Sequence, residues 1–211
     1  MKDLIIIGFG GFGREVDWLA ISCGRNVAGF LDDSYEPGIH EGYQVLGRVE
    51  QWVNYSACEF VVAVGNPRTR KLIVDKMLTF GDPEFATLVH PSAIMSPSVS
   101  VGAGSLICAH CTLTVNFSIG EHTILNMNVA AGHDVVIESF VTVAHLVAIS
   151  GNVTLEDGVE LGTNSAIRQG LTMARGSMLG MGGVMTKNAD KNMVYVGSPA
   201  KEFKKLEAFP S

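Results

Sequence analysis

The stretch that decides the fold runs from Ala93 to Asn188 and divides into sixteen consecutive hexads without an insertion. The hexads read AIMSPS, VSVGAG, SLICAH, CTLTVN, FSIGEH, TILNMN, VAAGHD, VVIESF, VTVAHL, VAISGN, VTLEDG, VELGTN, SAIRQG, LTMARG, SMLGMG and GVMTKN. The first position is mostly small or β-branched, with Phe117 and Leu171 as the large exceptions. The third position is always apolar: Met95, Val101, Ile107, Leu113, Ile119, Leu125, Ala131, Ile137, Val143, Ile149, Leu155, Leu161, Ile167, Met173, Leu179 and Met185.

A period of six excludes an amphipathic helix, whose apolar residues recur every 3.6 residues. Hexapeptide repeats are typical of a β-helix, in which each hexad supplies one short strand and one turn. Three hexads then complete one coil, so each third-position side chain points inward and stacks on its counterpart in the next coil. Glycine at the fourth position suits the turn backbone, and it occurs at Gly102, Gly120, Gly132, Gly162 and Gly180.

The preceding residues, 3–90, alternate between strand and helix patterns. The apolar run 4–7 before a glycine-rich segment predicts a buried parallel strand. Asn66 followed by Pro67 is typical of a helix cap and first helical residue. These signals predict a small parallel α/β domain, with further strands at 27–31 and 60–64 and helices at 13–22 and 67–79.

The composition limits the function classes. The chain has 211 residues, of which 47% are hydrophobic and 17% charged, so it can bury a sizeable core. A net charge of −6 argues against nucleic acid or an anionic membrane as the main partner, since both attract basic surfaces. The four cysteines form no disulfide framework, and the N-terminal segment has neither a signal-peptide pattern nor a membrane-spanning length. We therefore expect a cytoplasmic protein.

Two motifs accompany the hexads: IIIGFGGFGRE at 5–15 and VGSPAK at 196–201. Together with the hexads they resemble the sugar acyltransferase family that includes the bacillosamine and perosamine N-acetyltransferases and the sialic acid O-acetyltransferases. The resemblance implies a Rossmann-like nucleotide-sugar domain over 1–90, a left-handed parallel β-helix over 91–188 and a C-terminal tail over 189–211. It also implies a homotrimer with acetyl-CoA in the groove between neighbouring helices. Residues 199–208 are compatible with a terminal helix.

Acyl transfer from a thioester requires a base and an oxyanion donor, and histidine suits the role of base. The segment 126–140 resembles the family's catalytic stretch. By this resemblance His133 is the general base, Asp134 orients it, and Asn126 lies close to the active site. Nine residues after the base, where at least one relative has a donor-contacting histidine, this chain has Thr142. His145, three residues further on, either takes its place or is an ordinary surface residue.

Acetyl-CoA should bind through exposed coil edges. Gly151 lies eighteen residues after His133, one coil above it, and has no side chain to block the pantetheine. Gly180 and Gly182 lie where family members bind the coenzyme, and Lys187 could meet its phosphates. The ordinary role of such glycines is to form turns, and most surface lysines are simply solvated.

The N-terminal glycines follow a strand and open a helix, an arrangement that holds phosphate through backbone N–H groups. The predicted nucleotide-sugar contacts are Gly8, Gly10, Gly11, Phe12, Gly13, Arg14, Asp32, Asp33, Gly65 and Asn66. Asp32 and Asp33 follow the second strand, where a Rossmann acid meets ribose; the alternative is a cap or a solvated turn. The domain is short for NAD, which favours a mononucleotide sugar.

The favoured reaction is N-acetylation of an amino sugar linked to UDP, GDP or TDP. O-acetylation of a sugar such as sialic acid and a non-catalytic scaffold or sugar sensor remain alternatives. The Cys108–Cys111 pair has metal-ligand spacing, but its hexad positions should point the thiols apart. We therefore expect these cysteines to pack in the core, and we expect no metal.

Overall fold

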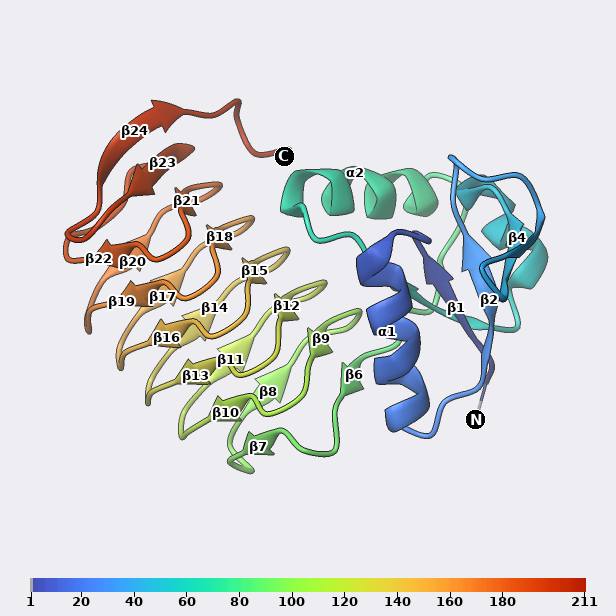
Figure 1. The fold of residues 1–211 in the computed structure, drawn as a ribbon, viewed down its shortest axis with the longest axis horizontal. Helices are drawn as coiled ribbons and strands as arrows, with labels where there is room; N and C mark the ends of the chain where they lie inside the picture. The colour runs from blue at the N-terminus through green and yellow to red at the C-terminus, as the bar shows by residue number, and fades with distance from the viewer. Residues whose placement is uncertain (1) are drawn as a thin grey trace.

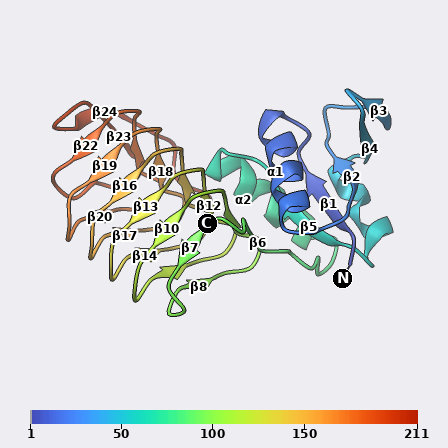
Figure 2. The ribbon, with the colours of Figure 1, turned by 60° about the horizontal axis from the view of Figure 1, so that its bottom comes forward.

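A computed structural model describes residues 2–211, so Met1 of the first predicted segment lies outside it. The described chain has two parts (Figure 1): an α/β part and a coil of stacked short strands, which lie side by side. A second view, turned by 60°, shows the coil as a regular stack with the α/β part along one side (Figure 2). The predicted fold class, a Rossmann-like domain followed by a left-handed parallel β-helix, is confirmed.

The α/β part contains one five-stranded sheet in the order β3-β4-β2-β1-β5. All pairings are parallel except that between β3 and β4. The buried run β1 lies between β2 and β5, as its apolar sequence predicts. The elements are β1 (Leu4–Ile7), α1 (Gly11–Ser22), β2 (Val27–Leu31), β3 (Gly38–His40), β4 (Tyr43–Gly47), the 3-10 helix η1 (Val49–Tyr55), β5 (Glu59–Val62) and α2 (Pro67–Leu78).

The coil has three sheets, which we name by what lies on their outer sides. The domain-facing sheet contains β6 (Leu88–Val89), β9 (Leu106–Ile107), β12 (Ile124–Leu125), β15 (Thr142–Val143), β18 (Glu160–Leu161), β21 (Met178–Leu179), β23 (Met193–Val196) and β24 (Lys201–Lys205). The alanine sheet contains β7 (Ile94–Met95), β10 (Thr112–Leu113), β13 (Ala130–Ala131), β16 (Ala148–Ile149), β19 (Ala166–Ile167) and β22 (Val184–Met185). The threonine sheet contains β8 (Ser100–Val101), β11 (Ser118–Ile119), β14 (Val136–Ile137), β17 (Thr154–Leu155) and β20 (Thr172–Met173).

Every strand of the hexad region pairs in parallel with the strand eighteen residues away, as in Leu125↔Val143 and Val143↔Leu161. Leu125, Val143 and Leu161 are third-position residues of successive coils, and their side chains are fully buried. The register therefore places corresponding corner residues of successive coils directly above one another. The Asn126 edge (126–129, 144–147, 162–165, 180–183) joins the domain-facing and alanine sheets. The His133 edge (132–135, 150–153, 168–171, 186–189) joins the alanine and threonine sheets, and the Gly158 edge (120–123, 138–141, 156–159, 174–177) joins the threonine and domain-facing sheets.

The α/β part packs on the early strands of the domain-facing sheet. Leu106 and Ile124 point outward from the coil, yet they are almost fully buried because they share one apolar cluster with Phe9 and Val16. The contact removes apolar surface of both parts from water, which favours a fixed arrangement. It also leaves the alanine and threonine sheets uncovered within one chain.

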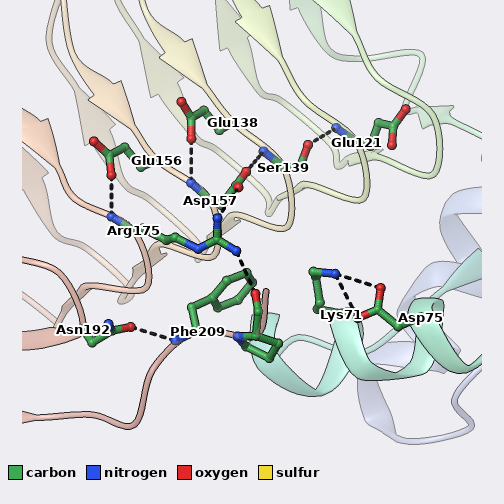
Figure 3. A network of polar contacts seen from close by, with 11 residues as sticks. Lys71, Asp75, Glu121, Glu138, Ser139, Glu156, Asp157, Arg175, Asn192 and Phe209 are labelled. Carbon is green, nitrogen blue, oxygen red and sulfur yellow. Dashed lines mark hydrogen bonds and ion pairs between the residues drawn. The ribbon is translucent and has the colours of Figure 1, made fainter.

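The C-terminal tail differs from the sequence-based expectation of a helix at 199–208. Residues 201–205 form β24, which pairs antiparallel with β23, and the remaining tail crosses the Gly158 edge. Figure 3 shows the contacts there: the Phe209 backbone N–H donates to Asn192 Oδ1 at 2.9 Å, and the Arg175 guanidinium lies 5.3 Å from the Phe209 ring. Residues 201–205 (KEFKK) are all exposed; they continue the domain-facing sheet and provide no apolar helical stripe.

Candidate active site

His133 lies in the turn between β13 and β14 on the His133 edge, with a half-exposed side chain. Its Nδ1 is 2.7 Å from Asp134 Oδ2, and Asn116 Nδ2 donates to Asp134 Oδ1 at 3.1 Å. The hydrogen bonds from His133 and then Asn116 lower the pKa of the Asp134 carboxyl. The carboxylate can therefore hold a proton on Nδ1 and leave Nε2 as the basic nitrogen.

A cavity of about 400 Å³ opens beside this histidine. Its lining is His133, Gly151, Asn152, Gln169 and Gly170. A Cβ on Gly151 would lie only 2.7 Å from His133 Nε2, so any larger residue would block the basic nitrogen. Gln169 was not singled out in the sequence, but it lies eighteen residues after Gly151, and counting one further coil would have found it.

The other predicted cofactor contacts do not all share this edge. Lys187 lies on the His133 edge, one coil beyond Gln169, and its Nζ is 3.7 Å from Glu202 Oε1. By the register, His145, Gly180 and Gly182 lie on the Asn126 edge, at the far side of the alanine sheet. Thr142 lies within the domain-facing sheet, where it is 7% exposed. Within one chain the predicted acetyl-CoA contacts therefore do not lie together at one site.

Asn126 also lies on the Asn126 edge and is nearly buried, with 8% of its surface exposed. Its side-chain Oδ1 lies 4.0 Å from Cys108 Sγ. Cys111 Sγ lies 3.2 Å from the Asn126 carbonyl oxygen. Burial raises the pKa of Cys108 to about 12 and that of Cys111 to about 11, so both are protonated thiols at neutral pH. No group of three or more potential metal-ligating side chains occurs within residues 2–211.

A second cavity, of about 170 Å³, lies at the carboxyl ends of the α/β strands. Asp32 is fixed there, since its two oxygens accept from the Phe9 and Ser34 backbone N–H groups at 2.8 Å each. Asp33 Oδ1 accepts from the Val49 N–H at 2.9 Å. The cavity is lined by Ile7, Gly8, Asp32, Asp33, Ser34, Val49, Val64 and Ile73.

The glycine-rich loop leads from this cavity into α1. Gly8 has φ +103°, a backbone conformation that favours glycine. A Cβ on Gly13 would lie 2.0 Å from the Gly8 carbonyl oxygen, so the loop and helix can pack closely only with glycine there. Gly10 is the N-cap of α1, and Gly11 and Phe12 begin the helix. Arg14 points elsewhere, with its Nη1 3.3 Å from Glu41 Oε2.

Gly65 and Asn66 lie where the α/β part meets the coil. Asn66 Oδ1 accepts from the Thr69 N–H at 3.0 Å, which confirms the predicted cap of α2. The Gly65 carbonyl oxygen accepts from Thr142 Oγ1 of the coil at 2.7 Å. These two residues therefore lie between the second cavity and the domain-facing sheet instead of lining the cavity itself. No helix within residues 2–211 is long and apolar enough to cross a bilayer.

Known proteins resemble both parts of the chain. Residues 3–77 match the family model of the PglD N-terminal domain. A UDP-N-acetylbacillosamine N-acetyltransferase of Bacillus subtilis (strain 168) is 32% identical over 114 residues, 52% of this chain and 52% of that protein. The chain thus spans about half the length of this curated relative in the alignment.

Solved structures match nearly the whole chain. A mutant of perosamine N-acetyltransferase from Caulobacter crescentus, in complex with CoA and GDP-perosamine, has a TM-score of 0.90 at 25% identity, covering 97% of this chain and 98% of that one. The acetyltransferase domain of PglB from Neisseria gonorrhoeae FA1090 has a TM-score of 0.87 at 28% identity, covering 96% and 100%. The resemblance drawn from the motifs is thereby confirmed.

Proposed function

Since the chain is a relative of the hexapeptide-repeat nucleotide-sugar acetyltransferases, we propose that it transfers an acetyl group from acetyl-CoA to the amino group of a nucleotide-linked amino sugar. One observation carries the proposal: a histidine, oriented by a carboxylate at 2.7 Å, faces a cavity that a glycine keeps open. Base, orienter and space for a thioester occur together at one place. The relatives' complexes with CoA and GDP-perosamine support the choice of substrates.

In the proposed reaction His133 Nε2 accepts a proton from the attacking amine as nitrogen bonds to the thioester carbonyl carbon. The C–S bond then breaks, and the imidazolium of His133 returns its proton to the leaving sulfur, so that CoA departs as a thiol and His133 is neutral again. Asp134 stabilises the positive charge that forms on the imidazole, which lowers the barrier. The nucleotide would occupy the 170 Å³ cavity beside Asp32 and Asp33.

We propose a homotrimer because the site is incomplete in one chain. Asn126, whose amide could donate to the oxyanion, lies across the alanine sheet from His133. A ring of copies brings the His133 edge of one protomer to the Asn126 edge of the next, since such an interface joins two different patches. The uncovered edges and alanine sheet carry exposed apolar side chains, including Ile94, Leu146 and Met181, which are 69%, 55% and 77% exposed.

The reaction is tested by thiol release from acetyl-CoA with a panel of UDP-, GDP- and TDP-linked amino sugars and with free sialic acid. We expect release with an amino sugar and none with sialic acid. Release with sialic acid alone would replace the N-acetylation proposal by O-acetylation. No release with any acceptor would favour a binding or scaffold role.

The shared site is tested by mixing two inactive variants, His133→Ala and Asn126→Ala, after joint unfolding and refolding. If each site takes its histidine from one protomer and its asparagine from the next, about one quarter of the sites in a random equal mixture are intact. Activity should therefore reappear on mixing. A mixture as inactive as either variant alone would contradict a site shared between protomers.

A further inference from the structure

Arg70 of α2 lies in the seam between the two parts and is only 1% exposed. On the coil side its Nε donates to the His122 carbonyl oxygen at 2.8 Å, and Nη2 donates to the carbonyl oxygen of Phe140 at 2.9 Å. On the α/β side Nη1 donates to the carbonyl oxygens of Val64 at 2.6 Å and Gly65 at 3.0 Å. One guanidinium thus ties the loop after β5 to two turns of the Gly158 edge.

Thr142 completes the same cluster from the coil. Its Oγ1 accepts from Arg70 Nη2 at 2.9 Å and donates to the Gly65 carbonyl oxygen at 2.7 Å. The hydroxyl is therefore occupied both as donor and as acceptor. Thr142 is nearly buried beneath the α/β part, and its hydroxyl has no free proton to donate to an acetyl donor.

The cluster is held by charge as well as by geometry. Burial lowers the pKa of Arg70 to about 9, while the negative charge of Glu160 acts against this fall. Arg70 is therefore still a cation at neutral pH. Its hydrogen-bond acceptors are carbonyl and hydroxyl oxygens, and hydrogen bonds from a cation to such oxygens are stronger than neutral ones.

The loop that the cluster holds belongs to the nucleotide cavity. Val64 lines the cavity, Gly65 follows, and Asn66 caps α2. Movement of this loop would alter the cavity and its distance from the coil. The hydrogen bonds of Arg70 and Thr142 thus join the cavity where a nucleotide would bind to the coil that carries the proposed acetyl-transfer residues.

We propose that Thr142, together with Arg70, is a positioning residue that fixes the 64–66 loop against the coil and so sets the nucleotide-sugar site. This gives Thr142 a different role from the donor contact implied by the family comparison. The inference rests on the proposed function for its kinetic consequences. Its structural content, a hydroxyl that holds the loop, stands apart from that function.

The test is Thr142→Val, which keeps the shape of the side chain and removes the hydroxyl. Gly65 keeps its bond from Arg70 Nη1, and Arg70 Nη2 keeps Phe140 and Val141, so no buried polar partner is stranded and the variant should fold. The variant loses two hydrogen bonds, but both partners keep others, so the net loss is about that of one hydrogen bond and corresponds to roughly a 3- to 10-fold rise in KM for the nucleotide sugar. KM for acetyl-CoA should stay unchanged, and Thr142→Ser should restore the wild-type values.

The matched control is Thr154→Val, at the same hexad position of the threonine sheet, away from the α/β part. This variant should change neither the KM for the nucleotide sugar nor the KM for acetyl-CoA. A rise in KM for acetyl-CoA in Thr142→Val, or equal behaviour of the two valine variants, would overturn the proposal.

A second readout separates this inference from the proposed reaction. Thr69 and Arg70 donate their backbone N–H groups to Asn66 at 3.0 Å and 2.9 Å. Amide hydrogen exchange at Thr69 and Arg70 should be faster in Thr142→Val than in Thr154→Val, whether or not the protein acetylates any sugar. Unchanged exchange at both amides would overturn the proposal. Absence of acetyl transfer by the wild-type protein, with faster exchange in the variant, would reject the reaction and keep the positioning role.

Discussion

The two parts of the molecule place their polar groups in different ways. In the coil, a constant step of eighteen residues puts His133, Gly151 and Gln169 around one cavity. In the α/β part, Asp32 and Asp33 lie in a loop, and each carboxylate accepts one backbone N–H from another segment, that of Phe9 or Val49. The coil thus positions side chains by register, and the α/β part positions them by individual hydrogen bonds.

This difference has a physical consequence for tolerance to change. A coil contacts mainly its neighbouring coils, so the stability of a solenoid is close to a sum of local terms. A loop at a sheet edge depends on several bonds at once, and the loss of one affects the others. We therefore expect substitutions on a coil edge to act locally, and substitutions at the seam to affect both parts.

The largest expected effect comes from His133→Ala. Loss of a general base lowers kcat by about 10²- to 10⁴-fold, while the half-exposed position leaves the coil intact. Steady-state thiol release measures the loss, and thermal unfolding with size analysis tests for an unchanged fold. His40→Ala, in the α/β part, is the matched control and should keep its kcat. Near-normal turnover of His133→Ala would reject the assignment.

A smaller effect should appear where the α/β part meets the coil, as a dependence of the free energy of unfolding on pH. Burial and then the positive charge of Arg70 lower the pKa of His122 from 6.5 to about 4, with Lys71 acting in the same sense and Asp75 against it. Between these values the unfolded chain binds a proton that the folded chain does not, so the free energy of unfolding falls as pH falls. The loss reaches about 3 kcal/mol below pH 4.

Chemical unfolding at several pH values measures this loss, and His122→Asn is the comparison, because asparagine tolerates the left-handed backbone at φ +52°. The variant should lose less stability than wild type between pH 7 and pH 4. Equal losses would show that His122 does not make the seam sensitive to acid.

The smallest expected effect concerns the tail. Gly158 has φ +67°, and a Cβ there would lie 2.1 Å from the Phe209 ring. Gly158→Ala combines backbone strain of about 1–2 kcal/mol with displacement of the ring, so proteases should cut the tail more readily. Gly24→Ala, at φ +71° with no atom within 4 Å of the added Cβ, isolates the strain. Equal proteolysis of both variants would contradict a packed tail.

The coil could be predicted almost residue by residue, because sixteen hexads in one register fix both the strands and the corners. The same count places Gly151 over His133 from the sequence alone. The same count puts Asn126 and His145 on one edge and Thr142 within a sheet, all away from His133. Their predicted roles came from family resemblance, which does not say on which face of one protomer a residue lies. The Arg70 cluster left no sequence signal, because an arginine on a helix is usually solvated.

The C-terminal tail shows a second reason why structure could not be predicted from the local sequence. Its backbone continues a sheet that already exists, so neighbouring strands decide its conformation over any local preference. Phe209 then fills space above Gly158 and Gly176, where only glycine leaves room. Neither effect can be found by reading residues 199–208 alone.

The pairing of each strand with the one eighteen residues away also limits how this protein can change its length in evolution. Duplication of a full coil would add one strand to each sheet, extend the molecule by about 4.8 Å and leave every edge aligned. Insertion of a single hexad would instead rotate all later residues by one face and carry corner residues such as Gly151 and Gln169 away from His133. Descendants of such a chain should therefore differ by whole coils far more often than by single repeats.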